Sequence, residues 1–354
     1  MLNFALVGCG RIAKRHSELL GLKQINGAQL IAVCDIDAEK ASNISDKLGV
    51  SAYSDMDQMM DSEKIDVVVV LTPSGLHAEH VIKLSKYGKH IMVEKPMALT
   101  LEDSDNMIEA CDANGIKLFI IKQNRFNVPV IKLKEAMDAG RFGKLTMGTV
   151  RVRWARHQAY YDQDDWRGTW AMDGGVLTNQ ASHHIDLLEW MMGDVESVFA
   201  KMTTSLADVE TEDTAIVTLK FKSGALGIIE ATTAARPSNL EGSISVLGER
   251  GTVVVGGIAV NEMTTWVFED KEDGDEDILK EFSVNPPDVY GFGHKAYYEH
   301  VVKCLMSGSS NLVDGLQGRK SVELITAIYQ SAETGKEVFL KFQSKNSRLG
   351  KLAT

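Results

Sequence analysis

The chain has 354 residues, more than one hydrophobic core usually serves, and this length predicts two domains. Its 44% hydrophobic and 25% charged residues are typical of soluble globular proteins. The formal net charge of -11 at pH 7 argues against a nucleic-acid-binding protein, and no apolar stretch approaches the ~20 residues that span a bilayer.

The first predicted elements form a glycine-rich dinucleotide turn. Residues 3–8 read as a buried strand, and Gly8, Gly10 and Ala13 follow in the spacing of that turn. Gly8 permits the tight turn, and Gly10 lets the backbone approach a pyrophosphate. A helix over about 11–22 then directs its amino terminus at the phosphates. The cofactor contacts expected here are Gly8, Gly10, Arg11 and Ile12.

An acidic residue ends the second strand. Residues 29–34 predict a strand, and Asp35 follows it directly. A carboxylate at this place accepts hydrogen bonds from a ribose 2′-hydroxyl and repels a 2′-phosphate. The sequence therefore favours NAD over NADP. The alternative is a tight turn without a ligand, which the strand before it, the helix after it and the acid make the weaker reading.

The alternation of strands and helices continues as in a parallel sheet. The continuous apolar run 64–71 is typical of a central parallel strand. Its loop, 72–77, lies at the carboxyl edge where such sheets bind ligands, so Thr72 and Ser74 are predicted cofactor contacts. For His77, a cofactor contact and a merely solvated histidine are equally good interpretations.

The most informative residue is Lys95, which follows an apolar strand in the run Glu94-Lys95-Pro96. A lysine on the buried side of a fold is costly unless an anion or a polar ligand satisfies it. Pro96 fixes the local turn, so that the ammonium is presented at a strand end. A surface lysine that closes a strand is the alternative. The nucleotide-binding pattern around it favours an active-site lysine.

The first domain is predicted to close with a helix over about 100–114, capped by Thr100, and a strand over 116–121. These elements define a Rossmann domain, a doubly wound parallel sheet, over residues 1–123. The remaining cofactor contacts expected from this domain are Glu94, Lys95 and Gln123.

The pattern changes in the second domain, which is predicted over 124–342. After a helix near 127–139 the strands are longer and alternate with a period of two, most clearly over 214–222. This pattern predicts an α+β domain with a large, mostly antiparallel sheet, one face of which is open to a partner subunit or a substrate. The other strands are predicted over 145–154, 197–205, 225–233, 242–247, 252–255 and 260–269.

The remaining features concern loops and the cell compartment. Residues 269–281 are acidic and read most simply as a solvated segment, and 343–354 read as a loose tail. Residues 3–8 already form a strand, which leaves no leader for export. Four scattered cysteines without metal spacing read as free thiols of a reducing cytosol, so a cytoplasmic protein is expected. They are Cys9, Cys34, Cys111 and Cys304.

A segment with chemical potential lies between the first two strands of the second domain. A Gly-Gly pair frees the backbone, and Thr178 is placed to cap a helix. Helical spacing puts four side chains along one side of that helix: Asn179, His183, Asp186 and Trp190. The pair His183-His184 does not predict a metal site, because adjacent helical positions diverge by about 100°. No metal is expected.

The glycine turn, Asp35, the Glu94-Lys95-Pro96 run and the helix with His183 occur together in this order. With them the chain resembles the glucose–fructose oxidoreductase/inositol dehydrogenase/MocA family across nearly its whole length. The resemblance implies an NAD-dependent dehydrogenase in which Lys95 contacts the substrate hydroxyl and the nicotinamide region. It also implies that His183 is the acid/base, and that the peptide before Pro96 is often cis.

The chain departs from the family at one place. The family has an aspartate four residues before the histidine, and this chain has Asn179 there. An amide cannot stabilise an imidazolium by charge, so Asn179 is expected to orient the substrate by hydrogen bonds. The residue that supports His183 is left open.

Motifs at 160–162, 166–170, 179–183, 239–243 and 290–294 carry a narrower resemblance. With them the chain resembles the branch of UDP-N-acetyl-2-amino-2-deoxyglucuronate dehydrogenases, which oxidise UDP-N-acetylglucosaminuronic acid at C3. The branch supplies diamino-uronate sugars of bacterial surface polysaccharides. The resemblance implies a homotetramer, and in some members 2-oxoglutarate accepts the hydride that regenerates NAD.

An anionic UDP-uronate requires cationic partners. The candidates are Arg125, Arg156 and Arg167, because a guanidinium grips a carboxylate or phosphate with two bonds. A surface or interface ion pair is the alternative for each of them. Trp166 and Arg167 are also expected beside the cofactor. The predicted substrate contacts are Lys95, Arg125, Arg156, Tyr160, Arg167, Asn179, Gln180 and His183.

The mechanism expected from these residues is alcohol oxidation. Neutral His183 would take the C3 hydroxyl proton, and Lys95 would donate to the same oxygen as negative charge develops. An inositol-type dehydrogenase of polyols or free sugars is the alternative on the same fold. A non-catalytic NAD-binding sensor is the alternative from another class, and the presence of both Lys95 and His183 counts against it.

Overall fold

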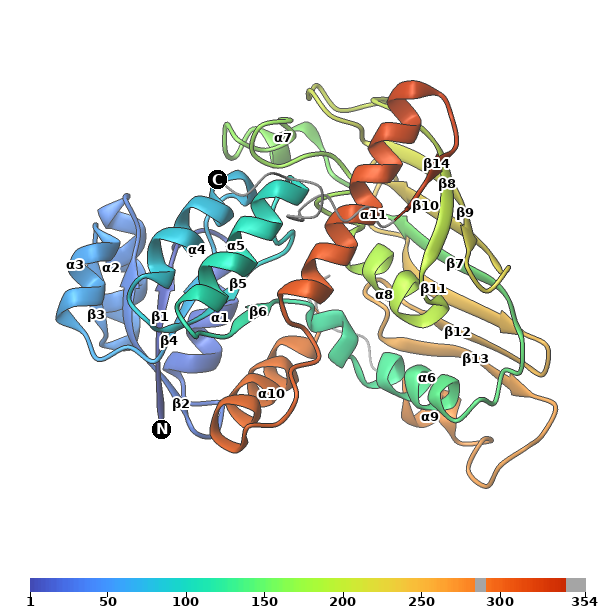
Figure 1. Ribbon diagram of the computed structural model, residues 1–354, viewed down its shortest axis with the longest axis horizontal. Helices are drawn as coiled ribbons and strands as arrows, with labels where there is room; N and C mark the ends of the chain where they lie inside the picture. Colours follow the sequence, from blue (N-terminus) through green and yellow to red (C-terminus); the bar gives the residue numbers. More distant parts are fainter. Residues whose placement is uncertain (284–290, 342–354) are drawn as a thin grey trace, which may run out of the picture.

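The computed structural model describes residues 1–283 and 291–341, and it has two sheets with helices between and around them (Figure 1). The first sheet is parallel throughout, with the strand order β3-β2-β1-β4-β5-β6 of a doubly wound Rossmann fold, as predicted. Its strands are β1 (Leu2–Val7), β2 (Ala28–Cys34), β3 (Ser51–Tyr53), β4 (Val67–Val70), β5 (His90–Val93) and β6 (Leu118–Ile120).

Helices cover both faces of this sheet, because its strands are apolar on both sides. Helix α5 begins where predicted, since the Thr100 side chain accepts a hydrogen bond from the backbone N–H of Asp103. The helices of the first domain are α1 (Ala13–Gly21), α2 (Ala38–Leu48), α3 (Met56–Ser62), α4 (His77–Ser85) and α5 (Leu101–Ala113), with the short 3-10 turns η1 (Ser74–Leu76) and η2 (Gln123–Phe126) after β4 and β6.

The second sheet has eight strands in the order β13-β12-β11-β7-β10-β9-β8-β14. All its described neighbours are antiparallel except the parallel pair β7 and β10, which confirms the mostly antiparallel prediction. Its strands are β7 (Leu145–Arg153), β8 (Val195–Thr203), β9 (Thr214–Phe221), β10 (Leu226–Thr232), β11 (Glu241–Gly248), β12 (Gly251–Gly256), β13 (Glu262–Phe268) and β14 (Val338–Phe339).

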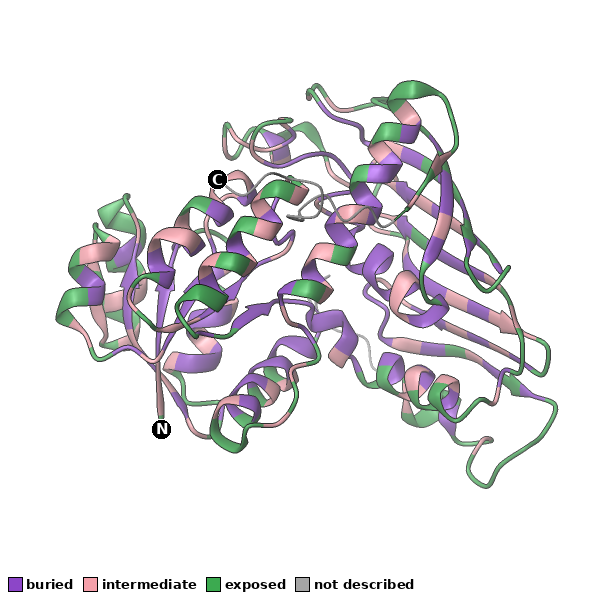
Figure 2. Cartoon of the chain, in the orientation of Figure 1, coloured by how far each residue is buried: buried purple, intermediate pink, exposed green. Residues whose placement is uncertain are grey.

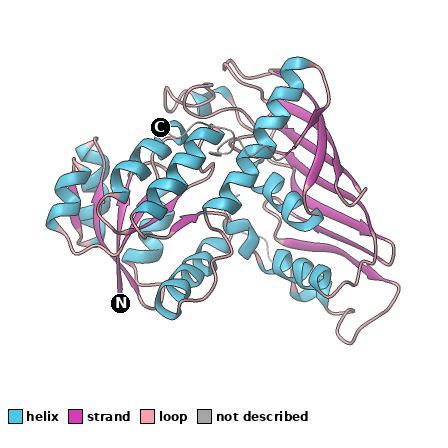
Figure 3. Cartoon of the chain, viewed as in Figure 1, coloured by secondary structure: helices cyan, strands magenta, loops and turns pink. Residues whose placement is uncertain are grey.

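One face of this sheet is covered and the other is open. The predicted alternation holds along β9, where Ala215, Val217 and Leu219 are buried in the core. Figure 3 shows the helices gathered on one side of the sheet, and Figure 2 shows exposed positions along its strands. Ile216 and Leu226, on the other face, are 57% and 58% exposed. The helices of this domain are α6 (Val128–Asp138), α7 (Gln158–Tyr161), α8 (Ser182–Met192), α9 (Ile278–Glu281) and α11 (Gly315–Thr334).

The last part of the chain returns to the first domain. Helix α10 (Gly293–Ser307) buries Tyr297, Tyr298 and Val301 in the same core as Phe4 of β1. Helix α11 then runs between the two sheets (Figure 1), and its side chains contribute to the cores of both. The first core therefore contains side chains from near the other end of the sequence in addition to those of residues 1–123.

The structure also bears on the predictions for the acidic segment, the cysteines and membrane spans. The acidic segment 269–281 is not merely solvated, because Asp275 pairs with Arg141 at 2.7 Å and accepts a hydrogen bond from Trp266 Nε1 at 2.6 Å. The four cysteines are free and buried. No helix in the described ranges is long and apolar enough to cross a membrane. The predicted tail, 343–354, lies outside the described residues.

Candidate active site

A cleft of about 990 Å³ lies at the carboxyl edge of the parallel sheet and extends to the second domain. It brings together every residue predicted to contact cofactor or substrate except Arg125. From the first domain these are Gly8, Gly10, Arg11, Ile12, Asp35, Thr72, Ser74, His77, Glu94, Lys95 and Gln123. From the second domain they are Arg156, Tyr160, Trp166, Arg167, Asn179, Gln180 and His183.

The glycine turn has the shape that a dinucleotide requires. Gly8 has a φ of 98°, and a Cβ there would lie 2.7 Å from the backbone carbon of Leu71. At Gly10, by contrast, a Cβ would meet no atom within 4 Å, so the bare backbone borders open space in the cleft. The turn leads directly into α1, whose first N–H groups have no side-chain cap. This end of the cleft fits a pyrophosphate.

Asp35 is fixed at the rim of the same end. Its Oδ2 accepts the backbone N–H of Cys9 at 2.7 Å, and its Oδ1 accepts that of Asp37 at 2.9 Å. These bonds tie the carboxylate to the glycine turn and leave it beside the cleft, where a ribose would lie. Sequence reasoning missed Ile36, Lys40 and Met56, which line this end. Their position just after β2 and β3 was the available signal, because loops at the carboxyl edge meet the cofactor.

His77 is neither solvated nor free to bind a ligand by its ring nitrogens. Its Nδ1 lies 2.8 Å from the carbonyl oxygen of Pro96, and its Nε2 lies 2.8 Å from that of Thr72. The side chain is buried, which lowers its pKa. The solvated interpretation is therefore wrong: His77 borders the cleft and ties the loop after β4 to the turn after β5.

Lys95 stands at the end of β5, before a cis peptide bond to Pro96. Its Nζ donates a 2.6 Å hydrogen bond to the backbone carbonyl of Asn179. Its backbone N–H donates to Glu94 Oε2 at 3.0 Å. Burial lowers the pKa of the ammonium, and the negative charges of Glu94 and Asp173 oppose that shift. The lysine thus reaches across from the first domain to the second.

Glu94 is buried behind Lys95 in a network that the sequence did not reveal. Its Oε1 lies 3.0 Å from His16 Nε2, and His16 Nδ1 lies 2.7 Å from the Tyr298 hydroxyl. His294 Nε2 is 3.9 Å from the same carboxylate oxygen. Ligand atoms of the two histidines and Glu94 lie within 4.8 Å of one another, as in a metal site. The hydrogen bonds of His16 already use both of its nitrogens.

His183 is the second residue of α8, and its support comes from an unexpected side chain. The Gln123 amide nitrogen lies 2.9 Å from His183 Nε2. Burial, and then the charge of Lys95, hold the pKa of His183 well below its ordinary value, so the imidazole is neutral at neutral pH. Thr178 does not cap the helix, which begins only at Ser182; its hydroxyl lies 2.8 Å from that of Tyr329.

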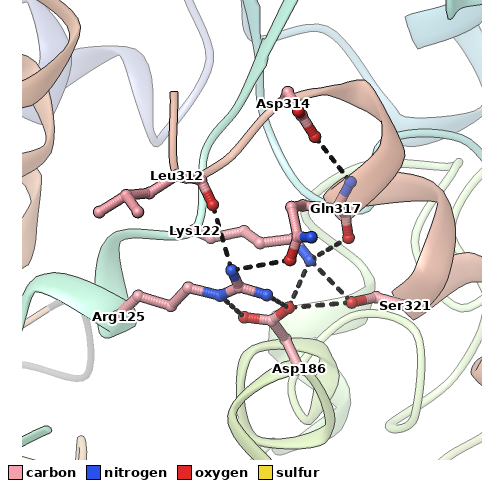
Figure 4. Close-up of polar contacts among 7 residues, drawn as sticks. All are labelled: Lys122, Arg125, Asp186, Leu312, Asp314, Gln317 and Ser321. Carbon is pink, nitrogen blue, oxygen red and sulfur yellow. Dashed lines mark hydrogen bonds and ion pairs between the residues drawn. The ribbon is translucent and has the colours of Figure 1, made fainter. Parts of the chain in front are cut away.

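Arg125 is a structural residue, which corrects its assignment to the substrate. Its Nε donates to Asp186 Oδ2 at 2.8 Å and its Nη2 to Asp186 Oδ1 at 2.7 Å (Figure 4). Lys122 pairs with the same carboxylate, and its Nζ donates to Ser321 Oγ at 2.8 Å. The arginine is drawn to this carboxylate and away from the cleft, and the cluster fastens η2, α8 and α11 together.

The two other predicted arginines both border the cleft, but only one of them pairs with a carboxylate. Arg167 is partly neutralised, since its Nε donates to Asp164 at 2.9 Å, and its Nη1 donates to the Tyr160 hydroxyl at 3.0 Å. Arg156 donates only to neutral oxygens, the carbonyl of Ala155 and the side chain of Asn239. Across residues 1–283 and 291–341 no carboxylate forms an ion pair with Arg156. Among the described residues, Arg156 therefore brings a positive charge without an ion pair to the cleft, as Arg11 and Lys95 also do.

These features together are those of an NAD-dependent dehydrogenase. The Rossmann sheet, the open glycine turn and Asp35 fit the cofactor, and the same cleft holds a lysine and a neutral histidine. Comparisons with known proteins agree. Residues 2–121 match the family model described as the oxidoreductase family, NAD-binding Rossmann fold, and residues 134–340 match that of its C-terminal alpha/beta domain. The chain belongs to the glucose–fructose oxidoreductase/inositol dehydrogenase/MocA family of oxidoreductases.

Three relatives illustrate the similarity. The WlbA dehydrogenase from Chromobacterium violaceum, solved in complex with NADH and UDP-GlcNAcA, is 44% identical, with a TM-score of 0.91 over 97% of each chain. That from Bordetella pertussis, in complex with the same two molecules, is 41% identical, with a TM-score of 0.89 over 97% of this chain and 98% of that chain. The myo-inositol 2-dehydrogenase of Thermotoga maritima is 32% identical over 96% of this chain and 99% of its own.

Proposed function

We propose that the protein oxidises the C3 hydroxyl of UDP-N-acetylglucosaminuronic acid with NAD, in the synthesis of sugars for bacterial surface polysaccharides. The observation that carries the proposal is Arg156, a cation without an ion-pair partner in the described chain, in the same cleft as Lys95 and His183. A uronate or a diphosphate supplies the negative charge that this guanidinium lacks. The two WlbA complexes with NADH and UDP-GlcNAcA support the same substrate.

The first domain would hold the cofactor. The backbone of Gly8 to Ile12 would bind the pyrophosphate, and Asp35 would accept hydrogen bonds from the adenosine ribose. When bound, NAD accepts the hydride that leaves the alcohol carbon. Thr72, Ser74 and Trp166 border the cleft between this end and the side chains that act on the alcohol.

Two side chains would act on the substrate hydroxyl. His183 is neutral, because burial lowers its pKa. Its Nε2, which the Gln123 amide faces at 2.9 Å, would take the proton of the C3 hydroxyl when that hydroxyl replaces the amide. The Lys95 ammonium donates one hydrogen bond to the Asn179 carbonyl, and another of its N–H groups would donate to the C3 oxygen and stabilise its negative charge as the proton leaves. The charge of Lys95 makes His183 a weaker base, but it also makes the hydroxyl a stronger acid, so the two effects offset one another.

A second candidate substrate is a neutral polyol. The 32% identity with the myo-inositol 2-dehydrogenase of Thermotoga maritima favours it. An inositol offers no anion to Arg156, however, and would leave that cation without a partner in the cleft. We therefore place the polyol second.

The test follows NADH formation by the purified protein with UDP-N-acetylglucosaminuronate, UDP-N-acetylglucosamine or myo-inositol. The uronate is expected to be the best substrate, and Lys95→Ala and His183→Ala to abolish its turnover. Arg156→Gln should raise KM for the uronate by about 10- to 100-fold, the loss of a charged hydrogen bond. Arg151→Gln, on β7, is the matched control with unchanged KM. Faster turnover of myo-inositol than of the uronate would contradict the proposal.

Three further expectations belong to the same proposal. The hydride acceptor that regenerates NAD is 2-oxoglutarate, so adding it should raise the yield of oxidised sugar without net NADH. The open face of the second sheet, with Ile216 and Leu226 exposed, supports assembly into a homotetramer, which light scattering would measure. The buried free thiols fit a cytoplasmic location.

A further inference from the structure

A buried carboxylate lies directly behind the cleft, in the segment that precedes α8. Asp173 is 1% exposed. Its Oδ1 accepts a 2.5 Å hydrogen bond from the side-chain amide of Asn179, and its Oδ2 accepts a 2.9 Å bond from the backbone N–H of Gly168. A buried charge is costly unless it is compensated, so a carboxylate in this place needs a reason.

Asn179 connects Asp173 to the lysine of the cleft. The backbone carbonyl of Asn179 accepts the 2.6 Å hydrogen bond from Lys95 Nζ. Its backbone N–H donates to the carbonyl of Gly175 at 2.9 Å, and Ser182 Oγ donates to its carbonyl at 3.1 Å. The residue is therefore held by its backbone on one side and by Asp173 on the other, with Lys95 as the group that it positions.

Asp173 also orders a second wall of the cleft. Gly168, which it binds, has a φ of 68° in the turn that follows Trp166 and Arg167. Both of those side chains border the cleft. A single buried carboxylate thus joins the turn with Trp166 to the residue that holds Lys95.

The charges around Lys95 also connect it to Asp173. Burial raises the pKa of Asp173, and the bonds from Gly168 and Asn179 and the positive charge of Lys95 oppose that rise. Burial lowers the pKa of Lys95, and Glu94 and Asp173 oppose the fall, whereas Arg156 and Arg167 add to it. Asp173 is therefore one of two anions that favour the charged form of the lysine among the cations of the cleft.

We propose that Asp173 is a positioning residue, which fixes Asn179 and the Gly168 turn so that Lys95 presents its ammonium to the reacting oxygen. The proposal rests on the proposed function, in which Lys95 donates to the alkoxide. Asp173 does not border the cleft itself and acts only through its neighbours.

The first test is Asp173→Asn. An asparagine here still accepts from Gly168 and, once the amide of Asn179 turns over, donates to it, so the substitution removes the charge and keeps the bonds. We expect kcat to fall roughly 10- to 100-fold, with KM for NAD and for the sugar changed less than about threefold. The alkaline limb of the pH profile should move to lower pH, because Lys95 loses an anion that favours its charged form.

An exchange of the two side chains is the sharper test. Asn179→Asp alone sets two carboxylates against each other in one buried bond and is expected to be the more damaging single variant. The double variant Asp173→Asn with Asn179→Asp restores one carboxylate and one amide, and should be more active than either single variant. Losses that simply add would overturn the proposal, as would an Asp173→Asn enzyme with the kcat and pH profile of the wild type.

Two controls test whether the effect is specific to Asp173 and whether it depends on the proposed substrate. Asp165→Asn removes an exposed charge from the same segment and should leave kcat and the pH profile unchanged. The rate of Lys95 acylation against pH, followed by mass spectrometry, reports the pKa of the lysine without any substrate. A downward shift in Asp173→Asn supports the proposal even if UDP-N-acetylglucosaminuronate is not the substrate. An unshifted lysine overturns it whatever the enzyme oxidises.

Discussion

Each of the two proposed catalytic residues has a buried carboxylate beside it, and the two carboxylates have different partners. Glu94 precedes Lys95 in the chain and faces the imidazoles of His16 and His294. Asp186 follows His183 by one helical turn and pairs with Lys122 and Arg125 (Figure 4). The first carboxylate fastens the end of β5, and the second fastens α8.

The partners give the two anchors different chemistry. Burial alone would raise the pKa of both carboxyl groups. The histidines outweigh it at Glu94, and the charges of Arg125 and Lys122 outweigh it at Asp186, so both pKa values lie below the ordinary range. An arginine keeps its charge across physiological pH, and the charge of Asp186 opposes the fall that burial causes in the pKa of Lys122. An unperturbed imidazole, by contrast, titrates near ~6.5. One anchor is a permanent ion pair, and the other responds to pH.

The largest effect is expected from Asp186→Asn. It leaves Lys122 and Arg125 buried without a counter-charge, which should lower the free energy of unfolding by about 3–5 kcal/mol. Urea unfolding at pH 7 measures the change. Asp138→Asn, which breaks an exposed ion pair with Lys134, is the matched control and should stay within about 0.5 kcal/mol. A cost below about 1 kcal/mol at Asp186 would contradict the role of the cluster.

Glu94→Gln is expected to cost less. The amide keeps an acceptor for His16, and the imidazoles can remain neutral, so no permanent charge is stranded. The free energy of unfolding should fall by about 1–3 kcal/mol in the same urea experiment. A cost equal to that of Asp186→Asn would erase the distinction between the two anchors.

The dependence of stability on pH sharpens the comparison. Burial lowers the pKa of His294, so below ~6.5 the unfolded chain binds a proton that the folded chain does not. The free energy of unfolding therefore decreases as the pH is lowered below ~6.5, by up to about 1.4 kcal/mol per pH unit for this group. His294→Gln should flatten the slope between pH 7 and pH 5.

The ion-pair anchor should behave differently over that pH range. The pKa of Asp186 is depressed, so its contribution is complete above the unfolded value near ~3.9 and is lost only in stronger acid. Glu189 also titrates in this range, because burial raises its pKa to about 7 and the charge of Asp186 adds to that rise. The comparison is therefore made in a Glu189→Gln background, in which Asp186→Asn should leave the slope between pH 7 and pH 5 as it is. A slope changed by Asp186→Asn and unchanged by His294→Gln in that background would reverse the assignment.

The smallest effect is expected from Ser321→Ala. The hydroxyl donates to Asp186 Oδ1 at 3.0 Å and accepts from Lys122 Nζ at 2.8 Å, but both charged groups keep other partners. A loss of about 1 kcal/mol in urea unfolding is expected. A loss as large as that of Asp186→Asn would mean that the cluster depends on this neutral group as much as on its charges.

Local patterns made most of the fold predictable from the sequence. Some signals need only a few consecutive residues: the turn at Gly8 and Gly10, the acidic Asp35 and the period of two along β9. The structure has each of these features where the sequence predicts it. The strands β3 and β14 were missed because they have only 3 and 2 residues, too few to display an alternation.

The sequence allowed us to predict the side chains that border the cleft, but not the buried partners behind them. Arg125 was assigned wrongly because a sequence displays a charge but not its partner, and Asp186 lies 61 residues away. His16 was missed for the same reason, since Glu94 is 78 residues further on. One signal was available: a carboxylate on a helix of mostly apolar residues, one turn after His183, requires a buried cation.

The return of α10 to the first sheet has a consequence for how the chain is made. Helices α1 and α2 cover only part of one side of the nucleotide-binding half, and the rest stays bare until Tyr297, Tyr298 and Val301 have left the ribosome. At ~5–20 residues per second, the nascent half waits on the order of 10–40 s with Phe4 and its neighbours uncovered. Chaperones have that interval in which to bind, and a stop codon placed anywhere before α10 should yield an aggregating fragment rather than a free-standing NAD-binding module.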